Sequence, residues 1–186
     1  MTEEGPIPDG DRVEVMLSSE TIQARVAELG AKISREYEGK DLTLVGILKG
    51  SVPFMSDLMR SITVPIQIDF LEVSSYGGSM ESSGVVRLVK DLSHPIVGKH
   101  VLMVEDIVDT GLTLRYLMEL FAAREPASIR IASLLDKPEG RKPGADFTVD
   151  YVGFSIPNAF VVGYGLDLGG YFRNLPYVGV YSPPEE

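Results

Sequence analysis

The sequence predicts an α/β fold in which a mostly parallel central sheet is flanked by helices. Short apolar runs of the kind found in buried strands alternate with stretches whose apolar residues recur every three or four positions. Strands that alternate with helices in this way generally form a parallel sheet. At 186 residues, with no internal repeat, the chain is long enough for one domain with a substantial core.

Continuous apolar runs predict strands that are buried on both faces, and these lie at 42–48, 101–104 and 129–135. Alternating apolar and polar residues predict a half-buried strand at 64–70, built on Val64, Ile66, Ile68 and Phe70. Val85 to Val89 is expected to form the return strand of a hairpin. Two shorter strands are expected at 151–156 and 159–162.

Three helices are predicted from apolar residues at helical spacing. The first begins at a cap supplied by Ser18 or Ser19 and ends near Gly39. The second covers 53–61, and the third leads from residue 114 to a point before Pro126. Residues 1–12 contain two prolines, two glycines and four acids, so we expect a flexible N-terminal tail before a single domain at 13–186.

Composition limits the classes of function. The sequence has no cysteine, which excludes disulfides, thiolate metal sites and a cysteine nucleophile. A net charge of −10 argues against general nucleic-acid binding. No apolar run approaches the ~20 residues of a membrane span, and the acidic N-terminus lacks a signal-peptide pattern. We therefore expect a cytoplasmic protein without a membrane or nucleic-acid partner.

The strongest functional signal lies at 101–114. An apolar run is followed by three acids and then by small or hydroxylated residues: Glu105, Asp106 and Asp109, then Thr110, Gly111 and Thr113. Ligands of open α/β sheets bind beyond the carboxyl ends of the strands, and a helix N-terminus attracts phosphate. The acids suit neutral hydroxyls or a metal ion, so a sugar phosphate fits both halves. The alternative is structural, with Asp109 or Thr110 as a helix cap and Glu105 and Asp106 as a solvated strand end.

Other polar positions are individually ambiguous. Lys49 and Gly50 follow a predicted strand, either as a second anion site or as an ordinary turn with a surface lysine. The Ser- and Gly-rich stretch 74–84 can be a hairpin loop or a lid. Asp167 and Arg173 are candidates for chemistry, although each alone is more often a surface residue.

Common nucleotide motifs are absent. The sequence has no P-loop, and the glycines at 163, 165 and 169 miss the dinucleotide-binding spacing by one residue. His94 and His100 are the only histidines, and neither has metal-ligand or triad spacing. General acid–base chemistry would therefore fall to carboxylates, lysine or tyrosine.

Seven separated stretches resemble, in the same order, the hypoxanthine phosphoribosyltransferases of the bacterial type: 48–51, 74–77, 81–84, 101–114, 134–138, 160–167 and 171–176. The resemblance implies a type I phosphoribosyltransferase fold with a small hood subdomain from the chain ends. It also implies purine salvage, in which a 6-oxopurine (hypoxanthine, with guanine) and phosphoribosyl pyrophosphate (PRPP) give IMP or GMP and pyrophosphate, with Mg²⁺. A homodimer or homotetramer is expected by the same resemblance.

The resemblance also implies roles for single residues. PRPP would bind Glu105 and Asp106 through its ribose hydroxyls and Thr110, Gly111, Leu112 and Thr113 through its 5′-phosphate. Pyrophosphate would meet Lys49, Gly50 and Arg173, under a lid that includes Ser75 and Tyr76. The purine would contact Lys137, Phe160, Val161 and Asp167, with Asp109 facing N7 as general base or hydrogen-bond partner. Mg²⁺ would be held by Glu105, Asp106 and Asp167.

Leu112 departs from the resemblance, because some relatives carry lysine there, so amides and hydroxyls must bind the 5′-phosphate without that cation. One alternative function is a PRPP or nucleotide sensor on the same fold, such as an RNA-binding attenuator of a pyrimidine operon. The acidic balance counts against RNA. A second alternative is the same enzyme type with a preference for xanthine or guanine.

Overall fold

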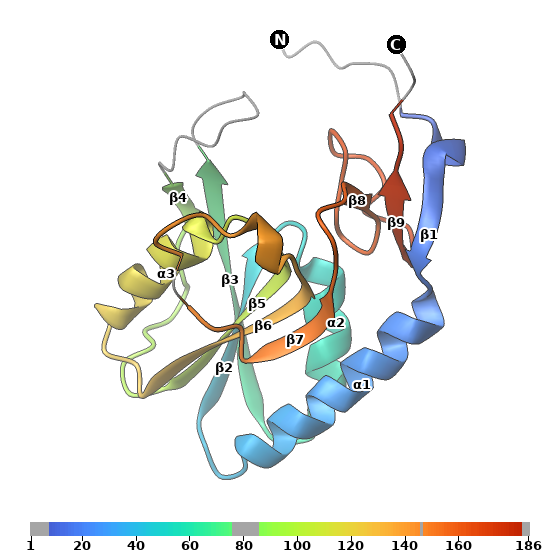
Figure 1. The fold of residues 1–186 in the computed structure, drawn as a ribbon. Helices are drawn as coiled ribbons and strands as arrows, with labels where there is room; N and C mark the ends of the chain where they lie inside the picture. Colours follow the sequence, from blue (N-terminus) through green and yellow to red (C-terminus); the bar gives the residue numbers. More distant parts are fainter. Residues whose placement is uncertain (1–7, 76–85, 146, 184–186) are drawn as a thin grey trace.

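A computed structural model describes residues 8–75, 86–145 and 147–183 (Figure 1). The helices are α1 (Ser19–Glu36), α2 (Val52–Ser61) and α3 (Leu112–Ala122), with short 3-10 turns η1 (Gly10–Arg12) and η2 (Pro138–Gly140). The strands are β1 (Val13–Leu17), β2 (Leu42–Leu48), β3 (Ile66–Ser75), β4 (Val86–Lys90), β5 (His100–Val108), β6 (Ser128–Asp136), β7 (Tyr151–Ser155), β8 (Val161–Val162) and β9 (Val178–Tyr181).

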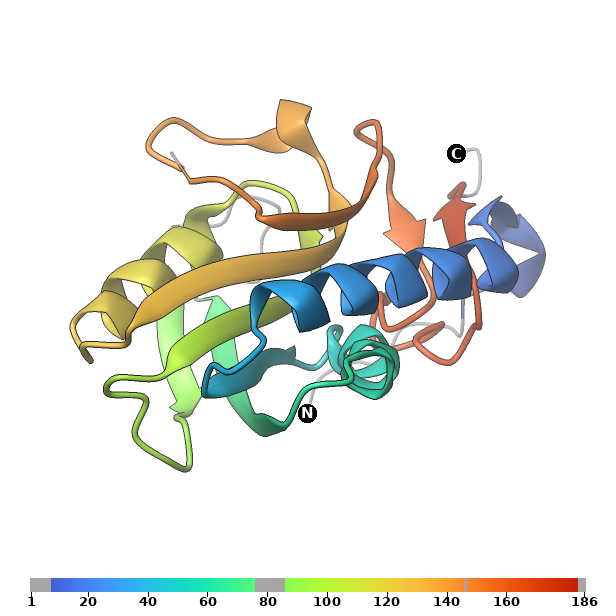
Figure 2. The same cartoon turned by 90° about the horizontal axis from the view of Figure 1, so that it is seen from below.

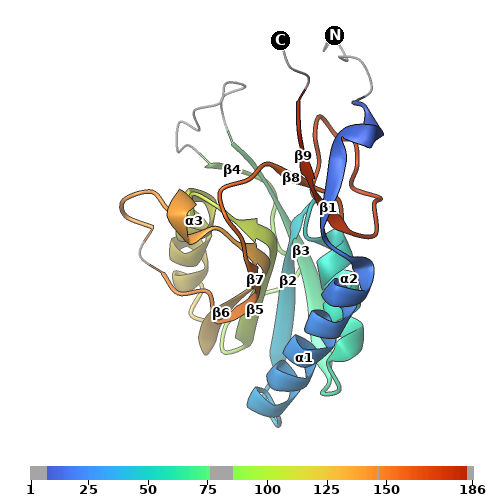
Figure 3. The ribbon, with the colours of Figure 1, turned by 45° about the vertical axis from the view of Figure 1, so that its right-hand side comes forward.

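The central sheet has six strands in the order β4-β3-β2-β5-β6-β7. All neighbours pair in parallel except β4, which runs antiparallel to β3 and is the return strand that the sequence predicts. Helices α1 and α2 cover one face, and α3 covers the other (Figures 1 and 3). This arrangement confirms the predicted α/β fold.

The sheet separates two apolar cores. In β5, Leu102 and Val104 join the core under α1 and α2, whereas Val101 and Met103 join the core under α3. All four side chains are fully buried. The strand is apolar throughout this stretch because both of its faces are covered.

A second sheet has three antiparallel strands in the order β1-β9-β8 and joins the two ends of the chain. It matches the expected hood. Helix α1 leads from this small sheet across one face of the large sheet (Figure 2). Ser18 caps α1, since its hydroxyl accepts a hydrogen bond from the Thr21 amide at 3.3 Å. No strand was predicted at the residues of β1 or β9.

Two predictions for strands need correction. The strand predicted at 101–104 continues to Val108, so Glu105 and Asp106 lie inside β5 and do not follow it. The pairing with β6 sustains it, because that ladder reaches Val108 opposite Asp136. The half-buried strand predicted at 64–70 corresponds to β3, which runs from Ile66 to Ser75. On the face predicted to be buried, Ile68 is 46% exposed, whereas Asp69 on the opposite face is only 9% exposed. Asp69 is buried because its carboxylate accepts the amides of Phe70 and Ser93.

The segment predicted as a tail is described only from residue 8. Within it, η1 is fixed at one end, since the Ser182 amide donates to the Arg12 carbonyl at 3.1 Å. The limits of the tail and of the single domain stay a prediction. Among the described helices, none is both long and apolar enough to cross a membrane.

Candidate active site

The candidate site lies where β5 extends beyond its neighbour β2. Pairing between the two strands ends at Gly46 and Val104, while pairing between β5 and β6 continues to Val108, opposite Asp136. Glu105 and Asp106 therefore lie beside the loop that follows β2. The carboxyl ends of the parallel strands meet at this edge, which is the usual place for a ligand in an open α/β sheet.

A pocket of about 290 Å³ opens at this edge. Its lining includes six of the residues that the sequence predicts for the site: Asp106, Asp109, Lys137, Phe160, Val161 and Asp167. They come from the end of β5 and the loop after it, from the end of β6, and from the segment around β8. Ile107 and Leu166 complete the lining and were not predicted.

Asp109 and Lys137 face each other in the pocket. The Lys137 ammonium lies 3.5 Å from Asp109 Oδ2. The lysine side chain is 8% exposed, whereas the Asp109 side chain is 45% exposed. A buried ammonium needs a partner, and the open carboxylate can also reach a ligand. The pair thus presents one donor and one acceptor side by side.

The backbone around Asp109 is held by the segment that follows β6. Arg141 Nη1 donates to the Asp109 carbonyl at 2.8 Å, and the Arg141 side chain also forms an ion pair with Asp136. A Cβ atom at Gly140 would lie 2.2 Å from Asp109 Oδ1. Neither residue carries a signal in the sequence, because these contacts depend on how the loop folds back.

Asp106 is held against the loop after β2. Its Oδ1 accepts the Ile107 amide at 2.8 Å, and a Cβ atom at Gly50 would lie 1.6 Å from its Oδ2. A side chain at position 50 would therefore have to displace the Asp106 carboxylate or the loop. Burial raises the pKa of Asp106, the nearby Arg173 opposes this, and the negative charge of Asp167 adds to it.

Glu105 is 8% exposed and does not line the pocket. Burial raises its pKa well above the ordinary value, and the adjacent negative charge of Asp106 adds to the effect. Two neighbouring acids with raised pKa values make a region that favours a cation or a hydroxyl ligand.

The loop between β5 and α3 contains the predicted phosphate-binding residues. Gly111 has φ +78° and stands at the N-cap of α3, where no side chain caps the helix. Leu112 and Thr113 are the first helical residues, so their amides have no partner within the helix. The Lys142 amide donates to the Thr110 carbonyl at 3.1 Å and fixes the loop from behind. The loop therefore presents free donors to an anion.

Arg173 and Asp167 form an ion pair of 2.5 Å, with the two side chains about one-third exposed. Arg173 Nη1 also donates to the Gly165 carbonyl and lies 3.5 Å from the Cβ position of Gly50. These contacts place Arg173 beside the loop after β2. Lys49 follows β2 next to Gly50 and is exposed, and the peptide bond between Leu48 and Lys49 is cis.

Only part of the predicted lid can be located. Ser75 ends β3, whereas Tyr76 and the rest of the predicted lid sequence up to residue 84 lie outside the described residues. Both lid assignments stay predictions.

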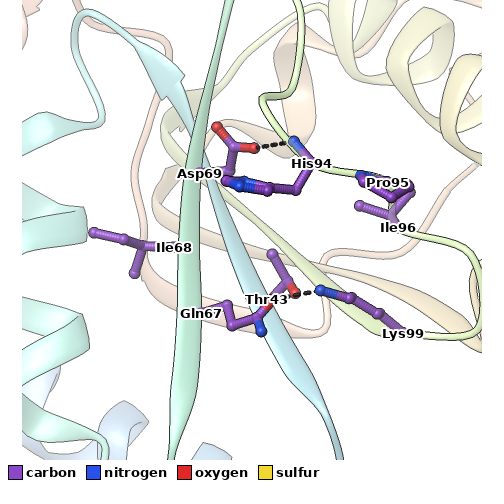
Figure 4. A pocket seen from close by; sticks show the side chains of 8 residues that line it. All are labelled: Thr43, Gln67, Ile68, Asp69, His94, Pro95, Ile96 and Lys99. Atoms are coloured by element: carbon purple, nitrogen blue, oxygen red, sulfur yellow. Dashed lines mark hydrogen bonds between the residues drawn. The ribbon is translucent and has the colours of Figure 1, made fainter.

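A larger pocket, of about 350 Å³, lies elsewhere, beside the first halves of β2 and β3 (Figure 4). Its lining contains Asp69, whose carboxylate is already used by backbone amides, and Lys99, which is hydrogen-bonded to Gln67. None of the predicted site residues lines it. Six of the predicted site residues line the smaller pocket instead.

The carboxylates of the candidate site are of a type that suits a divalent metal ion. Within the described ranges, no three acidic or histidine side chains are grouped as a ready metal site. Asp106 and Asp167, however, line the same pocket, where their negative charges repel each other. Mg²⁺ commonly uses one or two carboxylates together with water and substrate phosphates, so this donor set suits it.

Comparison with known proteins agrees with this geometry. The model of the phosphoribosyl transferase domain matches residues 15–168. The hypoxanthine-guanine phosphoribosyltransferase of Bacillus subtilis is 51% identical over 173 residues, which are 93% of this chain and 95% of that protein. That of Mycobacterium avium is 51% identical over 94% of this chain and 88% of the relative. A crystal structure of a hypoxanthine phosphoribosyltransferase from Staphylococcus aureus has a TM-score of 0.89 at 49% identity, covering 93% of this chain and 94% of the other.

The fold and the site define a type I phosphoribosyltransferase. Since the family model and these full-length relatives agree, the chain belongs to the phosphoribosyltransferase family.

Proposed function

We propose that this protein is a purine salvage enzyme that transfers the 5-phosphoribosyl group from PRPP to hypoxanthine or guanine. The observation that carries the proposal is the pair of Lys137 and Asp109, which faces a pocket beside an uncapped helix N-terminus. The similarity to hypoxanthine-guanine phosphoribosyltransferases over nearly the whole chain supports it.

The pair suits the edge of a 6-oxopurine on which O6 and N7 are neighbours. Lys137 donates to O6, and Asp109 faces N7 and accepts its proton as N9 attacks the ribose. Phe160, which is 53% exposed at the pocket, covers the face of the base, and Val161 offers its backbone. A 6-amino purine would set a donor against Lys137 and leave a buried polar group unpaired, which costs about 1–3 kcal/mol. Adenine should therefore be a poor substrate.

The phosphorylated substrate is proposed to lie across the ends of β2 and β5. Glu105 and Asp106 accept the ribose hydroxyls, and the loop 110–113 binds the 5′-phosphate. Lys49, Gly50 and Arg173 meet the pyrophosphate, on which negative charge grows as its bond to the ribose breaks. Asp106 and Asp167, with Glu105 nearby, are the proposed protein partners of Mg²⁺. The bound cation would further neutralise the negative charge on the pyrophosphate.

Water would compete with the purine for the ribose carbon, so exclusion of water is part of the proposed reaction. Ser75 and Tyr76 are the proposed lid residues. We propose further that the enzyme works in the cytoplasm as a homodimer or homotetramer, without a nucleic-acid partner. Light scattering would determine the oligomeric state.

The proposal is tested by mixing the protein with PRPP and Mg²⁺ and adding hypoxanthine, guanine, xanthine or adenine separately. Nucleotide formation is followed by absorbance. We expect turnover with hypoxanthine and guanine and none with adenine. PRPP binding without turnover of any base would refute the enzyme and indicate a sensor instead, for which RNA binding would then be measured.

Asp109→Asn separates catalysis from binding. The amide cannot accept the purine proton, so we expect kcat to fall by about 10²–10⁴-fold, the usual contribution of a general base. Binding of PRPP and of nucleotide, measured by calorimetry, should be largely kept. Asp41→Asn, an exposed carboxylate just before β2, serves as the control. Unchanged turnover in Asp109→Asn would remove Asp109 from the mechanism.

A further inference from the structure

Next to the pocket, three successive residues adopt left-handed backbone conformations. Gly163, Tyr164 and Gly165 have φ values of +93°, +48° and +101°. Glycine adopts this region freely, whereas a bulky residue does so only when other interactions compensate. Tyr164 is therefore the unexpected member of the turn, and its side chain should explain why it is there.

The Tyr164 side chain anchors the turn to the helical layer. Tyr164 is 5% exposed, and its hydroxyl donates to Asp57 Oδ2 of α2 at 2.6 Å. Gln23 of α1 donates to the same oxygen at 2.6 Å, and Arg60 forms an ion pair with Asp57. Burial alone would raise the pKa of Asp57, but these donors, with Tyr164 first among them, lower it overall. Asp57 thus stays a charged acceptor for the hydroxyl.

The same turn contacts the groups proposed to bind pyrophosphate. A Cβ atom at Gly165 would lie 1.9 Å from the Gly50 carbonyl oxygen. The Gly165 amide donates to the Arg173 carbonyl at 3.0 Å, and the Gly165 carbonyl accepts from Arg173 Nη1. Leu166 and Asp167 follow directly and line the pocket. Any shift of the turn would therefore move the loop after β2, the arginine and Asp167 together.

We propose that Tyr164 is a positioning residue for phosphoribosyl transfer, and that its hydrogen bond to Asp57 sets the placement of Gly50, Arg173 and Asp167 around the pyrophosphate. Tyr164 touches neither substrate nor metal in this role. The inference rests on the proposed function, because that function assigns the pyrophosphate to Gly50 and Arg173 and the accompanying Mg²⁺ to Asp167. Among the groups proposed to bind the base, Lys137 and Asp109 directly follow β6 and β5, and Val161 is held in β8 by pairing with Val180 of β9, so the turn should affect them little.

Tyr164→Phe removes the hydroxyl and keeps the ring. Since a hydrogen bond to a charged group is among the stronger ones, we expect the KM for PRPP to rise about tenfold. The KM for hypoxanthine should stay within about twofold of wild type. Calorimetry should show Mg²⁺–pyrophosphate binding weakened by a similar factor, independently of turnover. The variant Asp57→Asn tests the partner, and combining it with Tyr164→Phe should raise the KM for PRPP no further than the single changes.

Tyr151→Phe is the matched control. Tyr151 is 1% exposed, and its hydroxyl donates to Glu36 of α1 at 2.7 Å, so it is also a buried tyrosine bonded to a carboxylate on a helix. It does not line the pocket. Both variants should lose thermal stability, but only Tyr164→Phe should change PRPP and pyrophosphate binding.

The inference would be overturned if Tyr164→Phe kept the wild-type KM for PRPP and the wild-type affinity for Mg²⁺–pyrophosphate. An equal effect of Tyr151→Phe would also overturn it, since that would indicate a general loss of rigidity. Failure of the proposed function looks different, because the wild type would then turn over no base. In that case the inference is tested by the affinities of wild type and Tyr164→Phe for Mg²⁺–pyrophosphate. Equal affinities, or no binding by either protein, would refute it.

Discussion

Adjacent residues of one strand meet different surroundings in this site. Glu105 is buried away from the pocket, whereas Asp106 faces both the pocket and the loop after β2. Burial raises the pKa of each carboxyl group. Buried carboxyl groups with raised pKa values commonly serve function at the expense of stability. The two acids should therefore destabilise the protein when no ligand is bound.

Replacement of Glu105 tests this expectation. Because folding raises the Glu105 pKa above its ordinary value of 4.5, the folded state binds more protons between the two values, and stability falls as pH rises through that interval. Glu105→Gln should raise the Tm at pH 8 by about 2–4 °C for each kcal/mol of relieved penalty. The gain should shrink as the pH falls below 4.5, because the carboxyl group then becomes protonated in both states.

Scanning calorimetry at several pH values measures this effect, with the exposed Glu38→Gln as the control. A loss of stability of the same size at every pH would contradict the expected role of the buried charge. PRPP affinity should fall in Glu105→Gln despite the gain in stability, because an amide replaces a charged acceptor for the ribose hydroxyls.

At the scale of elements, the site depends on unequal strand lengths. β2 ends at Leu48 while β5 continues to Val108, so the loop after β2 turns over the end of β5 that does not pair with β2. Gly50 allows this close approach, since any side chain there would meet the Asp106 carboxylate. The spacing of these two elements, and not only the residues they carry, sets the geometry of the site.

Gly50→Ala tests the close approach. The added methyl group must displace the loop or Asp106, and a misplacement of about 1 Å in an active site can cost about 10²-fold in kcat/KM. We expect a loss of that order with PRPP, measured at saturating hypoxanthine. Gly10→Ala is the control, because a Cβ atom there would meet its nearest neighbour at 4.0 Å. Wild-type kinetics in Gly50→Ala would show that the loop has room to move.

At the scale of the whole molecule, the net charge of −10 opposes the approach of a substrate that is itself strongly negative. Local groups can offset this field only in part. Arg173 is partly neutralised by Asp167, and Lys137 by Asp109. We therefore expect a divalent cation to be required for tight binding of PRPP.

Thermal unfolding with and without Mg²⁺ measures this requirement. PRPP at about 100 times its Kd stabilises a protein by about 2.7 kcal/mol, which corresponds to a rise in Tm of about 5–10 °C for a chain of this size. The rise should be seen with PRPP and Mg²⁺ together and should be mostly lost when EDTA is added. Mg²⁺ alone is the control. An equal shift in EDTA would show that the protein binds PRPP without the cation.

The sequence by itself determined the features that depend on local patterns. The apolar runs at 42–48 and 129–135 and the helical spacing after Gly111 reflect burial within one element, so they can be recognised without knowledge of distant residues. The run of acids and hydroxylated residues at 105–113 could be recognised for the same reason, because it is continuous in the chain. Other predicted pocket residues, such as Phe160 and Asp167, rested on the resemblance to a known family.

Only the tertiary structure decided the rest, because those features join residues that are far apart in the chain. β1 and β9 are strands because they pair with each other, although they lie more than 160 residues apart in the sequence, and β1 shows no strong pattern of its own. Asp69 is buried because amides more than twenty residues away satisfy it. The contact of Gly50 with Asp106 and the bond from Tyr164 to Asp57 likewise form only when the chain is folded, since a local sequence pattern carries no information on which distant segments come into contact.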